Sequence, residues 1–404
     1  MNRLIRKCLS FLLVITTLIC GLSVSAHAQE DAVLISNTDS SSTTSDVGVA
    51  EGSLNLNCKS AILMEATTGA VLYVQNAEEA LPPASVTKIM TLLLLMEAID
   101  GGHVKLDGTV TVSENAASMG GSQVYLKVGE QMAVEDLLKS VIIASANDAA
   151  VALAEYLCGS VEAFTQRMNE RAKQLGMKDT YFENATGLDD TAEKHLTSAK
   201  DIAIMSRELI RHKTVLQYSS IWMDSIRNGE FGLTNTNRLV RFYPGCTGLK
   251  TGSTSKAGFC ISVTAQREDL SLICVIMGSE SGDIRNAAAA SLLDWGFANY
   301  GLYTAPEGSL APIGVMGGMQ DICPLTYSAF SCVLPKGKLT LVEQKFDISE
   351  TTTAPVREGD VMGRVCYVLE GKELGTVEVK ALQAIERLHF FEILRRLAAS
   401  FTLI

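Results

Sequence analysis

The sequence predicts an α/β (α+β) fold in which helices cover an antiparallel sheet, followed by a small all-β domain and a C-terminal amphipathic helix. Two observations lead to this fold class. The first part of the chain carries β-like runs on either side of a long helical region, and the next part carries only short β-like runs between turns. Strands that flank helical segments bury those helices against a shared sheet. We therefore expect the first and last strands of the main domain to be neighbours.

Length, composition and charge restrict the class of protein. With 404 residues and 47% hydrophobic content, the chain can form two or three domains with a sizeable core. Its net charge of -11, together with the lack of a basic cluster containing aromatic residues, argues against a nucleic-acid partner. The five histidines form no His-Glu-x-x-His pattern, so neither a metal site nor another cofactor is predicted.

The N-terminus has the pattern of a secretory signal peptide over residues 1–28. Three basic residues precede an apolar run over residues 11–22, and Ala26-His27-Ala28 is an A-x-A cleavage site. Such a signal would export the protein to the outer face of the cytoplasmic membrane or the cell-wall space. A permanent N-terminal anchor is the alternative. Residues 29–54 are rich in Ser, Thr and Asp and are expected to form a flexible leader.

Cysteine usage leaves the redox state open. Ten cysteines are present, of which Cys8 and Cys20 fall in the signal peptide. An exported chain can pair cysteines as disulfides. A core of this size does not need such bridges, so buried free thiols are equally consistent with the sequence. The remaining cysteines form no Cys-x-x-Cys motif and are Cys58, Cys158, Cys246, Cys260, Cys274, Cys323, Cys332 and Cys366.

The main domain is predicted over residues 55–302. Runs at Ser60–Glu65 and Val71–Val74 flank a Thr-Thr-Gly turn and predict a hairpin. Pro82-Pro83 then leads into a helix whose apolar run suits a buried position. Later elements follow from periodicity and caps. Helices are expected over residues 134–143, 149–156, 161–175, 197–212 and 285–300; short strands are expected over 109–112 and 123–126, with a strand that opens at 250–252 and continues over 258–265, and another over 270–277.

Two regions follow the main domain. Residues 303–380 carry short runs such as Leu339–Val342 and Val361–Val368 between Pro, Gly and charged turns, and predict a small β-sandwich-like domain. Residues 381–404 contain a helix with apolar residues on one side and charged residues on the other. This helix is too short and too charged to span a bilayer, and we expect it to lie on a membrane surface. Packing on its own protein, or on a second copy, is the alternative.

A Ser-x-x-Lys pattern at the start of the first helix carries the clearest chemistry. Ser85 and Lys88 are three residues apart, so their side chains return to the same helix face. Burial favours the neutral amine, which can then take the proton of the hydroxyl. The positive end of the helix favours the oxyanion that forms. The pattern is weak alone, because a capped helix with a surface lysine has the same residues.

Two further motifs follow in order, Ser145-Ala146-Asn147 and Lys250-Thr251-Gly252, in a loop between helices and at a strand edge. With them the chain resembles the penicillin-binding serine acyl-transferases, which use S-x-x-K, S-x-N and K-T-G in this order. More narrowly, it resembles low-molecular-mass D-alanyl-D-alanine carboxypeptidases of the sporulation and housekeeping type, from about Ser60 to the C-terminus. Other stretches that carry the resemblance are Ser118-Met119-Gly120-Gly121-Ser122, Asn184-Ala185-Thr186-Gly187-Leu188-Asp189, Asn235-Thr236-Asn237-Arg238-Leu239 and Lys256-Ala257-Gly258.

The resemblance implies a penicillin-binding/β-lactamase-like fold and a role for each residue of these motifs. Ser85 is expected to attack the carbonyl between two D-alanines, with Lys88 as its general base. Ser145 would pass a proton to the leaving amine, and Asn147 would hold the substrate amide and the lysine. The backbone N–H groups of Ser85 and Ser253 are expected to form the oxyanion hole.

The terminal carboxylate of the substrate is expected to face Lys250 and Thr251, which offer a cation and a hydroxyl. Gly252 would let the substrate backbone approach the strand edge. Arg285 lies where the family often carries an arginine near this pocket, with a helix-surface arginine as the alternative. Ser253 stands where relatives often carry His, Phe or Tyr, which leaves the side-chain preference near the leaving D-alanine open.

The resemblance implies a peptidoglycan stem peptide ending in D-Ala-D-Ala as substrate and β-lactams as covalent inhibitors. Three other functions remain open. A β-lactamase uses the same motifs, but the E-x-x-L-N glutamate of class A is missing between Asn147 and Lys250. The motifs do not separate a D,D-endopeptidase from a carboxypeptidase. A non-catalytic wall-binding module is disfavoured by the intact serine–lysine pair.

Overall fold

The structure, a computed structural model, describes residues 50–51, 54–189 and 192–401. The predicted signal peptide and most of the predicted leader lie outside the described residues. Ala50 and Glu51, near the end of that leader, pair as a short parallel strand with the main sheet. Two residues of the stretch that we expected to be flexible therefore pair with the sheet.

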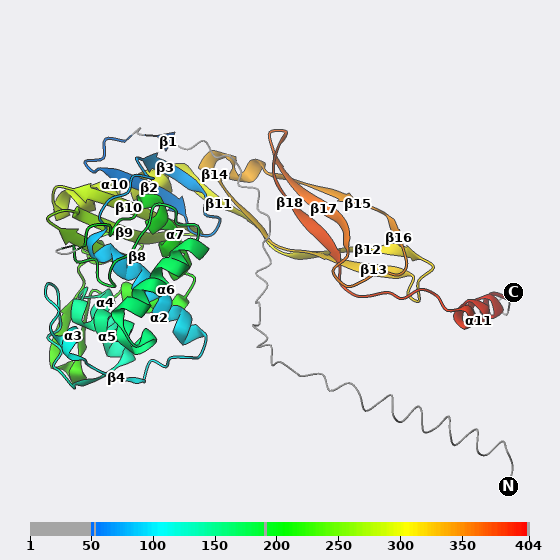
Figure 1. Cartoon of the computed structure of the whole chain (residues 1–404). Helices are drawn as coiled ribbons and strands as arrows, with labels where there is room; N and C mark the ends of the chain where they lie inside the picture. Colours follow the sequence, from blue (N-terminus) through cyan, green and yellow to red (C-terminus); the bar gives the residue numbers. More distant parts are fainter. Residues whose placement is uncertain (1–49, 52–53, 190–191, 402–404) are drawn as a thin grey trace, which may run out of the picture. The chain divides into compact units, whose positions relative to one another are not determined.

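The main domain is built on a six-stranded sheet with the order β1-β3-β2-β10-β9-β8 (Figure 1). All neighbouring strands are antiparallel except β1 with β3. Strand β2 pairs with β10, with Ser60 opposite Met277, which confirms that the first predicted strand and the last are neighbours. The strands are β1 (Ala50–Glu51), β2 (Ser60–Glu65), β3 (Val71–Gln75), β8 (Cys246–Thr254), β9 (Gly258–Arg267) and β10 (Leu270–Ser279).

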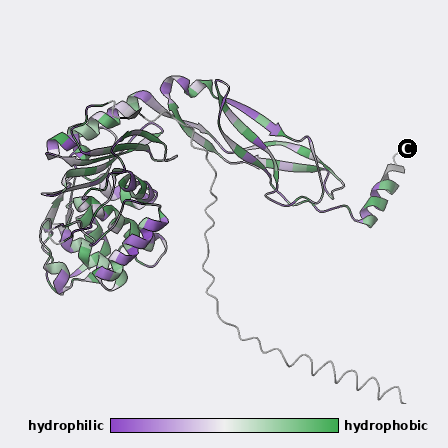
Figure 2. Cartoon of the chain, turned by 45° about the horizontal axis from the view of Figure 1, so that its top comes forward, coloured by the Kyte–Doolittle hydropathy of each residue, from purple (hydrophilic) through white to green (hydrophobic). Residues whose placement is uncertain are grey.

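Helices cover both faces of this sheet, and in Figure 2 the strands between them are mostly hydrophobic. Alternate residues of β10 point to opposite faces. Ile273 and Val275 face the helices that lie between β3 and β8 in the sequence, whereas Leu272 and Cys274 face α10. The remaining elements of the domain are η1 (Ala84–Thr87), α2 (Lys88–Asp100), β4 (Thr109–Thr111), α3 (Glu114–Ala117), β5 (Gln131–Ala133), α4 (Val134–Ile142), α5 (Asn147–Cys158), α6 (Val161–Gln174), α7 (Ala199–Leu209), α8 (Lys213–Ser219), β6 (Met223–Ile226), η2 (Arg227–Gly229), β7 (Phe231–Thr234), α9 (Leu239–Phe242) and α10 (Gly282–Asn299).

The segment from Lys250 onward was predicted as one continuing strand, and this is wrong, because a tight turn separates β8 from β9. Gly258 has a φ of +64°, which glycine adopts at little cost. Thr254 Oγ1 accepts a hydrogen bond from Ala257 N at 3.0 Å within the turn. The chain reverses there, so β8 becomes an edge strand of the sheet.

A predicted strand over residues 123–126 is also wrong, since β4 pairs instead with β5. The backbone N–H groups of Val124 and Leu126 donate to the Asp148 carboxylate, with donor–acceptor distances of 3.0 and 3.1 Å. Asp148 is fully buried at the start of α5 and also accepts from Ala149 N at 2.9 Å. The carboxylate thus takes the place of a neighbouring strand and fixes this segment to the helix start.

A C-terminal all-β region follows the main domain. Its larger sheet has the order β15-β17-β18-β13-β12-β16, and β11 pairs with β14 separately. The predicted strand over residues 361–368 is confirmed as β17. The predicted strand over residues 339–342 is wrong, because after Pro335 the chain forms the 3₁₀ helix η3, whose Leu339 packs against β11 at Gly301. The elements are β11 (Tyr300–Ala305), β12 (Gly308–Met316), β13 (Ile322–Tyr327), β14 (Phe330–Pro335), η3 (Lys336–Leu341), β15 (Glu343–Ile348), β16 (Thr351–Thr353), β17 (Val361–Leu369) and β18 (Lys372–Ala381).

The last element is the helix α11 (Phe390–Phe401), which carries both hydrophobic and hydrophilic residues (Figure 2). Phe390, Phe391 and Ile393 are exposed. Within the part of the chain that the structure describes, no helix has the length and apolar character needed to cross a membrane.

The buried Asp148 carboxylate provides a test of this fold. Asp148→Ala would leave the N–H groups of Val124 and Leu126 without their acceptor, so we expect the free energy of unfolding to fall by about 2–4 kcal/mol. Urea denaturation followed by circular dichroism measures this change. Asp283→Ala removes a carboxylate whose side chain is 87% exposed and should cost less than about 1 kcal/mol. Equal losses in the two variants would contradict the role given to Asp148.

Candidate active site

The site begins at the turn that leads into α2. Lys88 Nζ lies 2.8 Å from Ser85 Oγ, so the two side chains meet as their spacing predicted. Lys88 is completely buried, and Nζ also donates to Asn147 Oδ1 at 2.6 Å and to the Thr186 carbonyl at 2.8 Å. The amine therefore contacts groups from η1, from the start of α5 and from the loop before α7.

Two glycines hold the Ser85 turn in place. A Cβ atom on Gly252 would lie 2.7 Å from Ser85 N and 2.8 Å from Val86 N, so β8 packs directly on the turn. Gly187 has a φ of +83°, and a Cβ atom there would lie only 1.8 Å from the Ala84 carbonyl oxygen. Any side chain at either position would push the turn away. Gly252 thus has a packing reason in addition to the substrate approach expected from the sequence.

The second motif lies between α4 and α5 and faces β8. Lys250 Nζ donates to Ser145 Oγ at 2.8 Å and to the Thr251 carbonyl at 2.9 Å. Ser145 has a φ of +62°, an unfavourable conformation for a residue with a side chain, which is often found at functional sites. Asn147 Nδ2 donates to the Gly120 carbonyl at 2.7 Å while its oxygen accepts from Lys88. Asn147 thus connects Lys88 to the loop that contains Gly120.

The remaining predicted residues lie along β8 and on α10. Thr251 Oγ1 donates to Thr236 Oγ1 at 2.7 Å, and Ser253 is exposed two residues further on. Arg285 is buried on α10 rather than exposed on its surface, and it donates to the Cys260 carbonyl at 3.3 Å and to Asn286 Oδ1. The contacts form two groups, which meet along β8: Ser85, Lys88, Asn147 and Gly252 in one, and Ser145, Lys250 and Thr251 in the other. Arg285 contacts neither group, but its positive charge helps to lower the pKa of Lys250.

Burial changes the pKa of both lysines. Burial, and then the positive charge of Lys250, hold the pKa of Lys88 well below its ordinary value, although the nearby Asp148 carboxylate opposes this. Burial, and then the charge of Arg285, lower the pKa of Lys250 to about 7. The site therefore favours the neutral amine at both lysines more than water does.

Sequence reasoning missed His195, which contacts Thr87 at the end of the Ser85 turn. The imidazole is buried, with Nε2 2.7 Å from Thr87 Oγ1, and Nδ1 accepts a hydrogen bond from Glu183 N at 3.0 Å. Nε2 therefore carries the proton and donates to Thr87. Burial lowers the pKa of His195 to about 4, which keeps the ring neutral at neutral pH. No sequence signal distinguishes this histidine, whereas the Thr186 carbonyl lies in a stretch already connected with the family.

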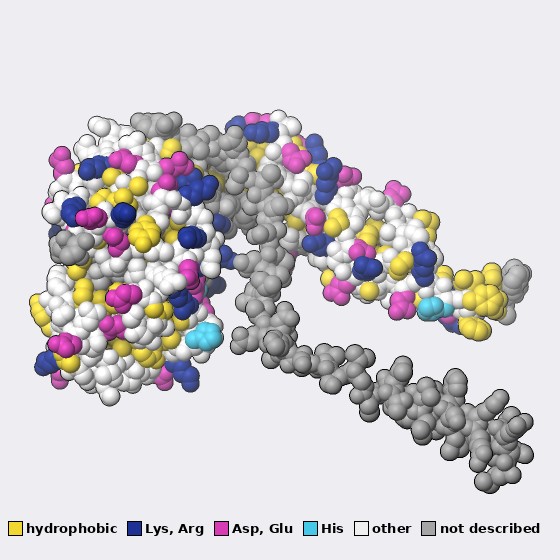
Figure 3. Space-filling view, in the orientation of Figure 1, with side chains coloured by type: hydrophobic (Ala, Val, Ile, Leu, Met, Phe, Trp, Pro, Cys, Tyr) yellow, Lys and Arg dark blue, Asp and Glu magenta, His cyan; other side chains and the backbone are white. Residues whose placement is uncertain are grey.

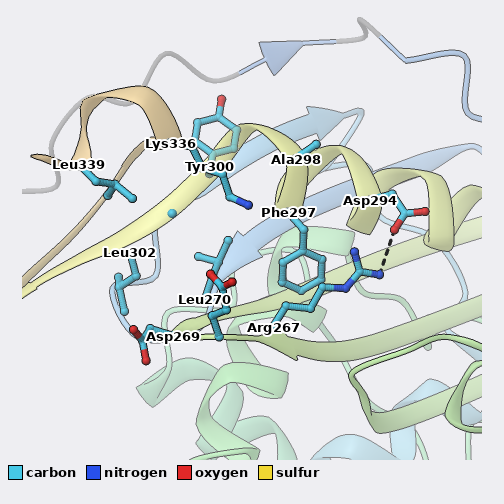
Figure 4. Close-up of a pocket in the computed structure, with 12 residues that line it drawn as sticks. Arg267, Asp269, Leu270, Asp294, Phe297, Ala298, Tyr300, Leu302, Lys336 and Leu339 are labelled. Atoms are coloured by element: carbon cyan, nitrogen blue, oxygen red, sulfur yellow. Dashed lines mark hydrogen bonds and ion pairs between the residues drawn. The ribbon is translucent and has the colours of Figure 1, made fainter.

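Two cavities lie outside these contacts. One, of about 610 Å³, lies at the end of β9 away from Gly258 and includes Arg267, Asp294 and Leu339 in its lining (Figure 4). The other, of about 660 Å³, includes Tyr125 and Phe231. None of the predicted site residues lines either cavity. Among the described residues no group of His, Cys, Asp and Glu could hold a metal ion.

The site combines a Ser-x-x-Lys helix start with the edge strand of a sheet that helices cover on both faces. This combination is typical of the class of serine acyl-transferases that contains the penicillin-binding proteins and serine β-lactamases. Comparison with known proteins agrees. Residues 47–281 match the family model described as D-alanyl-D-alanine carboxypeptidase, and residues 313–387 match the model for the C-terminal domain of penicillin-binding protein 5. The chain belongs to the D-alanyl-D-alanine carboxypeptidase family, a family of serine peptidases.

Individual relatives cover most of the chain. D-alanyl-D-alanine carboxypeptidase DacF of Bacillus subtilis is 40% identical over 352 residues, which are 85% of this chain and 90% of that protein. DacC of Escherichia coli is 33% identical and covers 83% of this chain and 86% of its own length. The crystal structure of penicillin-binding protein 5 from Haemophilus influenzae superposes with a TM-score of 0.73 at 30% identity, over 83% of this chain and 99% of that one. Penicillin-binding protein D2 from Listeria monocytogenes, solved in its ampicillin-bound form, covers 60% of this chain and 99% of its own, with 32% identity and a TM-score of 0.56.

The contact between Gly252 and the Ser85 turn leads to a mutational test. Gly252→Ala places a methyl group against Ser85 N and Val86 N, so we expect at least a tenfold loss of kcat/KM for D-alanine release, because the turn must shift. Release is measured with a peptide ending in D-Ala-D-Ala. Gly232→Ala in β7 is the matched control, since its new Cβ atom would meet no atom within 4 Å. Unchanged activity in Gly252→Ala would show that the turn tolerates displacement.

Proposed function

We propose that this carboxypeptidase removes the terminal D-alanine from peptidoglycan stem pentapeptides through an acyl-enzyme on Ser85. The observation that carries the proposal is the 2.8 Å contact between Ser85 Oγ and the buried Lys88 amine. A neutral amine has two hydrogens and one lone pair. The hydrogens suit Asn147 Oδ1 and the Thr186 carbonyl, and the lone pair is then left for the proton of Ser85.

Ser85 and Lys88 exchange a proton in one direction during acylation and in the opposite direction during deacylation. Ser85 Oγ bonds to the carbonyl carbon between the two D-alanines while its proton passes to Lys88 Nζ, and the N–H groups of Ser85 and Ser253 stabilise the oxyanion. The proton then reaches the leaving amine through Ser145 as the C–N bond breaks. A water molecule next attacks the carbonyl carbon of the ester and gives a proton to Lys88 Nζ. The bond between that carbon and Ser85 Oγ then breaks, and Lys88 returns the proton to the serine oxygen.

The substrate carboxylate is assigned to the β8 side of the site. Lys250 supplies a cation and Thr251 a hydroxyl, and the buried Arg285 adds positive charge behind them. A β-lactam would enter the same site and acylate Ser85, as the ampicillin-bound form of the Listeria relative suggests for this family. Its opened ring stays attached to the acyl group, so the leaving amine cannot depart and the adduct persists.

The proposal includes a location. The pattern of residues 1–28 supports export, and α11 would hold the protein at the outer face of the cytoplasmic membrane by lying in the interface. The apolar side chains of Phe390, Phe391, Ile393 and Leu394 are exposed on α11, which supports this assignment. Residues 29–54, 55–302, 303–380 and 381–404 would then serve as leader, peptidase domain, β domain and membrane helix.

A single incubation tests the proposed reaction. The chain from residue 29 is mixed with a pentapeptide ending in D-Ala-D-Ala, and mass spectrometry should show the loss of one D-alanine. Ser85→Ala and Lys88→Arg should each lower the rate about 1,000-fold or more, because one removes the nucleophile and the other replaces the neutral amine with a permanent cation. Full activity of Lys88→Arg would rule out a neutral base. Preferred cleavage of a cross-linked dimer would indicate an endopeptidase, and fast nitrocefin turnover a β-lactamase.

The two lysines also lead us to expect a bell-shaped pH dependence of kcat/KM. Activity should rise as pH passes the lowered pKa of Lys88, because the neutral amine is the base. It should fall above about pH 7, where Lys250 loses the charge that holds the carboxylate. Lys250→Arg stays charged and should move the alkaline limb up by more than one pH unit, whereas the exposed Lys105→Arg should not. If Lys250→Arg leaves the alkaline limb of the pH profile unchanged, loss of the Lys250 charge does not cause that limb.

A further inference from the structure

We propose that the turn between β12 and β13 is a second membrane-contacting element, which enters the lipid interface beside α11. We name its three apolar residues, Met316, Met319 and Ile322, the hairpin tip. This inference rests on the proposed function, in which α11 lies on a membrane. It adds the hairpin tip of the β domain to the membrane contact that the proposed function assigns to α11 alone.

The hairpin and the segment leading to α11 are joined by hydrogen bonds. Leu388 N donates to the Gly317 carbonyl at 2.9 Å, and Met319 N donates to the Glu386 carbonyl at 2.8 Å. Arg396 of α11 then reaches back to the same turn, with Nη1 2.6 Å from Asp321 Oδ1 and Nη2 2.7 Å from the Met319 carbonyl. These contacts hold the helix against the turn, so a bilayer that binds one meets the other.

The orientation of α11 leaves its apolar residues available. Glu392 and Arg396 are one turn apart and bond to each other, with 3.3 Å between Oε1 and Nε, on the side that faces the hairpin. Phe390 and Leu394 lie on the opposite side of the helix and are exposed, as is Phe391, which is 82% exposed. Figure 3 shows hydrophobic side chains gathered on α11. The polar side of α11 thus makes the contacts with the turn between β12 and β13, and the apolar side points away from that turn.

The hairpin tip carries exposed apolar side chains of its own. Ile322 lies opposite Gly314 in the β12–β13 register, and Met316 follows Gly314 by two residues, so Met316 and Ile322 share one face of the hairpin. Their side chains are 57% and 56% exposed, and Met319 between them is also exposed. Three apolar side chains on an exposed turn are unfavourable in water, and they become favourable once the tethered helix brings them to lipid.

Charged side chains of both signs surround the apolar residues of α11 and the hairpin tip, among them the exposed Asp321 and Glu386. Arg395 on α11 has a side chain that is 76% exposed and also bonds to Glu392 at 2.7 Å. Arginine next to apolar and aromatic side chains is the composition of elements that lie at headgroup level on anionic membranes. We therefore assign the occupant as the headgroup and upper acyl region of an anionic bilayer.

The test uses the chain from residue 29 and vesicles of phosphatidylglycerol and phosphatidylethanolamine. The double variant Met316→Ser/Ile322→Ser should partition about tenfold more weakly than the unchanged chain in cosedimentation. The matched control is Leu341→Ser/Val361→Ser, since these residues of the same β region are 52% and 55% exposed, and it should stay within twofold. D-alanine release reports that each variant is folded.

A second measurement does not depend on a loss of binding. Ile322→Trp and Val361→Trp are compared by quenching with brominated lipids, and only the tryptophan at 322 should give added quenching. If removal of residues 385–404 abolishes binding while the tip variants bind normally, the hairpin tip is not a contact and the membrane role of α11 stands. If the unchanged chain does not bind, both proposals fail. If light scattering shows a dimer that the tip variants lose, the patch joins two copies and the lipid assignment is wrong.

Discussion

The amino group of Lys88 is the point on which the rest of the main domain depends. It contacts the hydroxyl of Ser85, the amide oxygen of Asn147 and the carbonyl of Thr186, which come from segments far apart in the sequence. An amine buried away from water is unfavourable unless each of its polar atoms has a partner. The start of α2, the start of α5 and the loop before α7 must therefore meet around one nitrogen atom, and β8 closes on the same turn.

The two buried lysines have different proposed tasks in similar surroundings: Lys88 as a base and Lys250 as a cation for the substrate carboxylate. Both lose water, but Lys88 also faces the charge of Lys250, whereas Lys250 faces that of Arg285. Burial and a neighbouring positive charge lower the pKa of both lysines, so each amine gives up its proton more readily than a lysine in water.

Local patterns predicted the parts of the site that depend on local geometry. The three-residue spacing of Ser85 and Lys88 on a helix start predicted their contact, and the pattern around Lys250 predicted that this residue lies on a strand. The turn after Thr254 was missed because Ser255, Lys256 and Ala257 carry no strong turn signal, and the reversal depends on the positive φ of Gly258. Asp148 and His195 were missed because a lone acid or histidine has no spacing to reveal that backbone N–H groups from elsewhere will bind it. A carbonyl such as that of Thr186 has no side-chain signature at all.

The pairing of β2 with β10 also governs when the domain can fold. Ser60 lies opposite Met277, so the sheet cannot close until nearly the whole domain has been synthesised. Contacts between residues so distant in sequence form slowly, because a long loop must be ordered before they are made. If the peptidase is exported as proposed, this delay would leave the chain open enough to be threaded through a membrane. The Ser85 turn would then gain its β8 neighbour only after that passage, so the hydrolytic machinery would first assemble where its wall polymer is found.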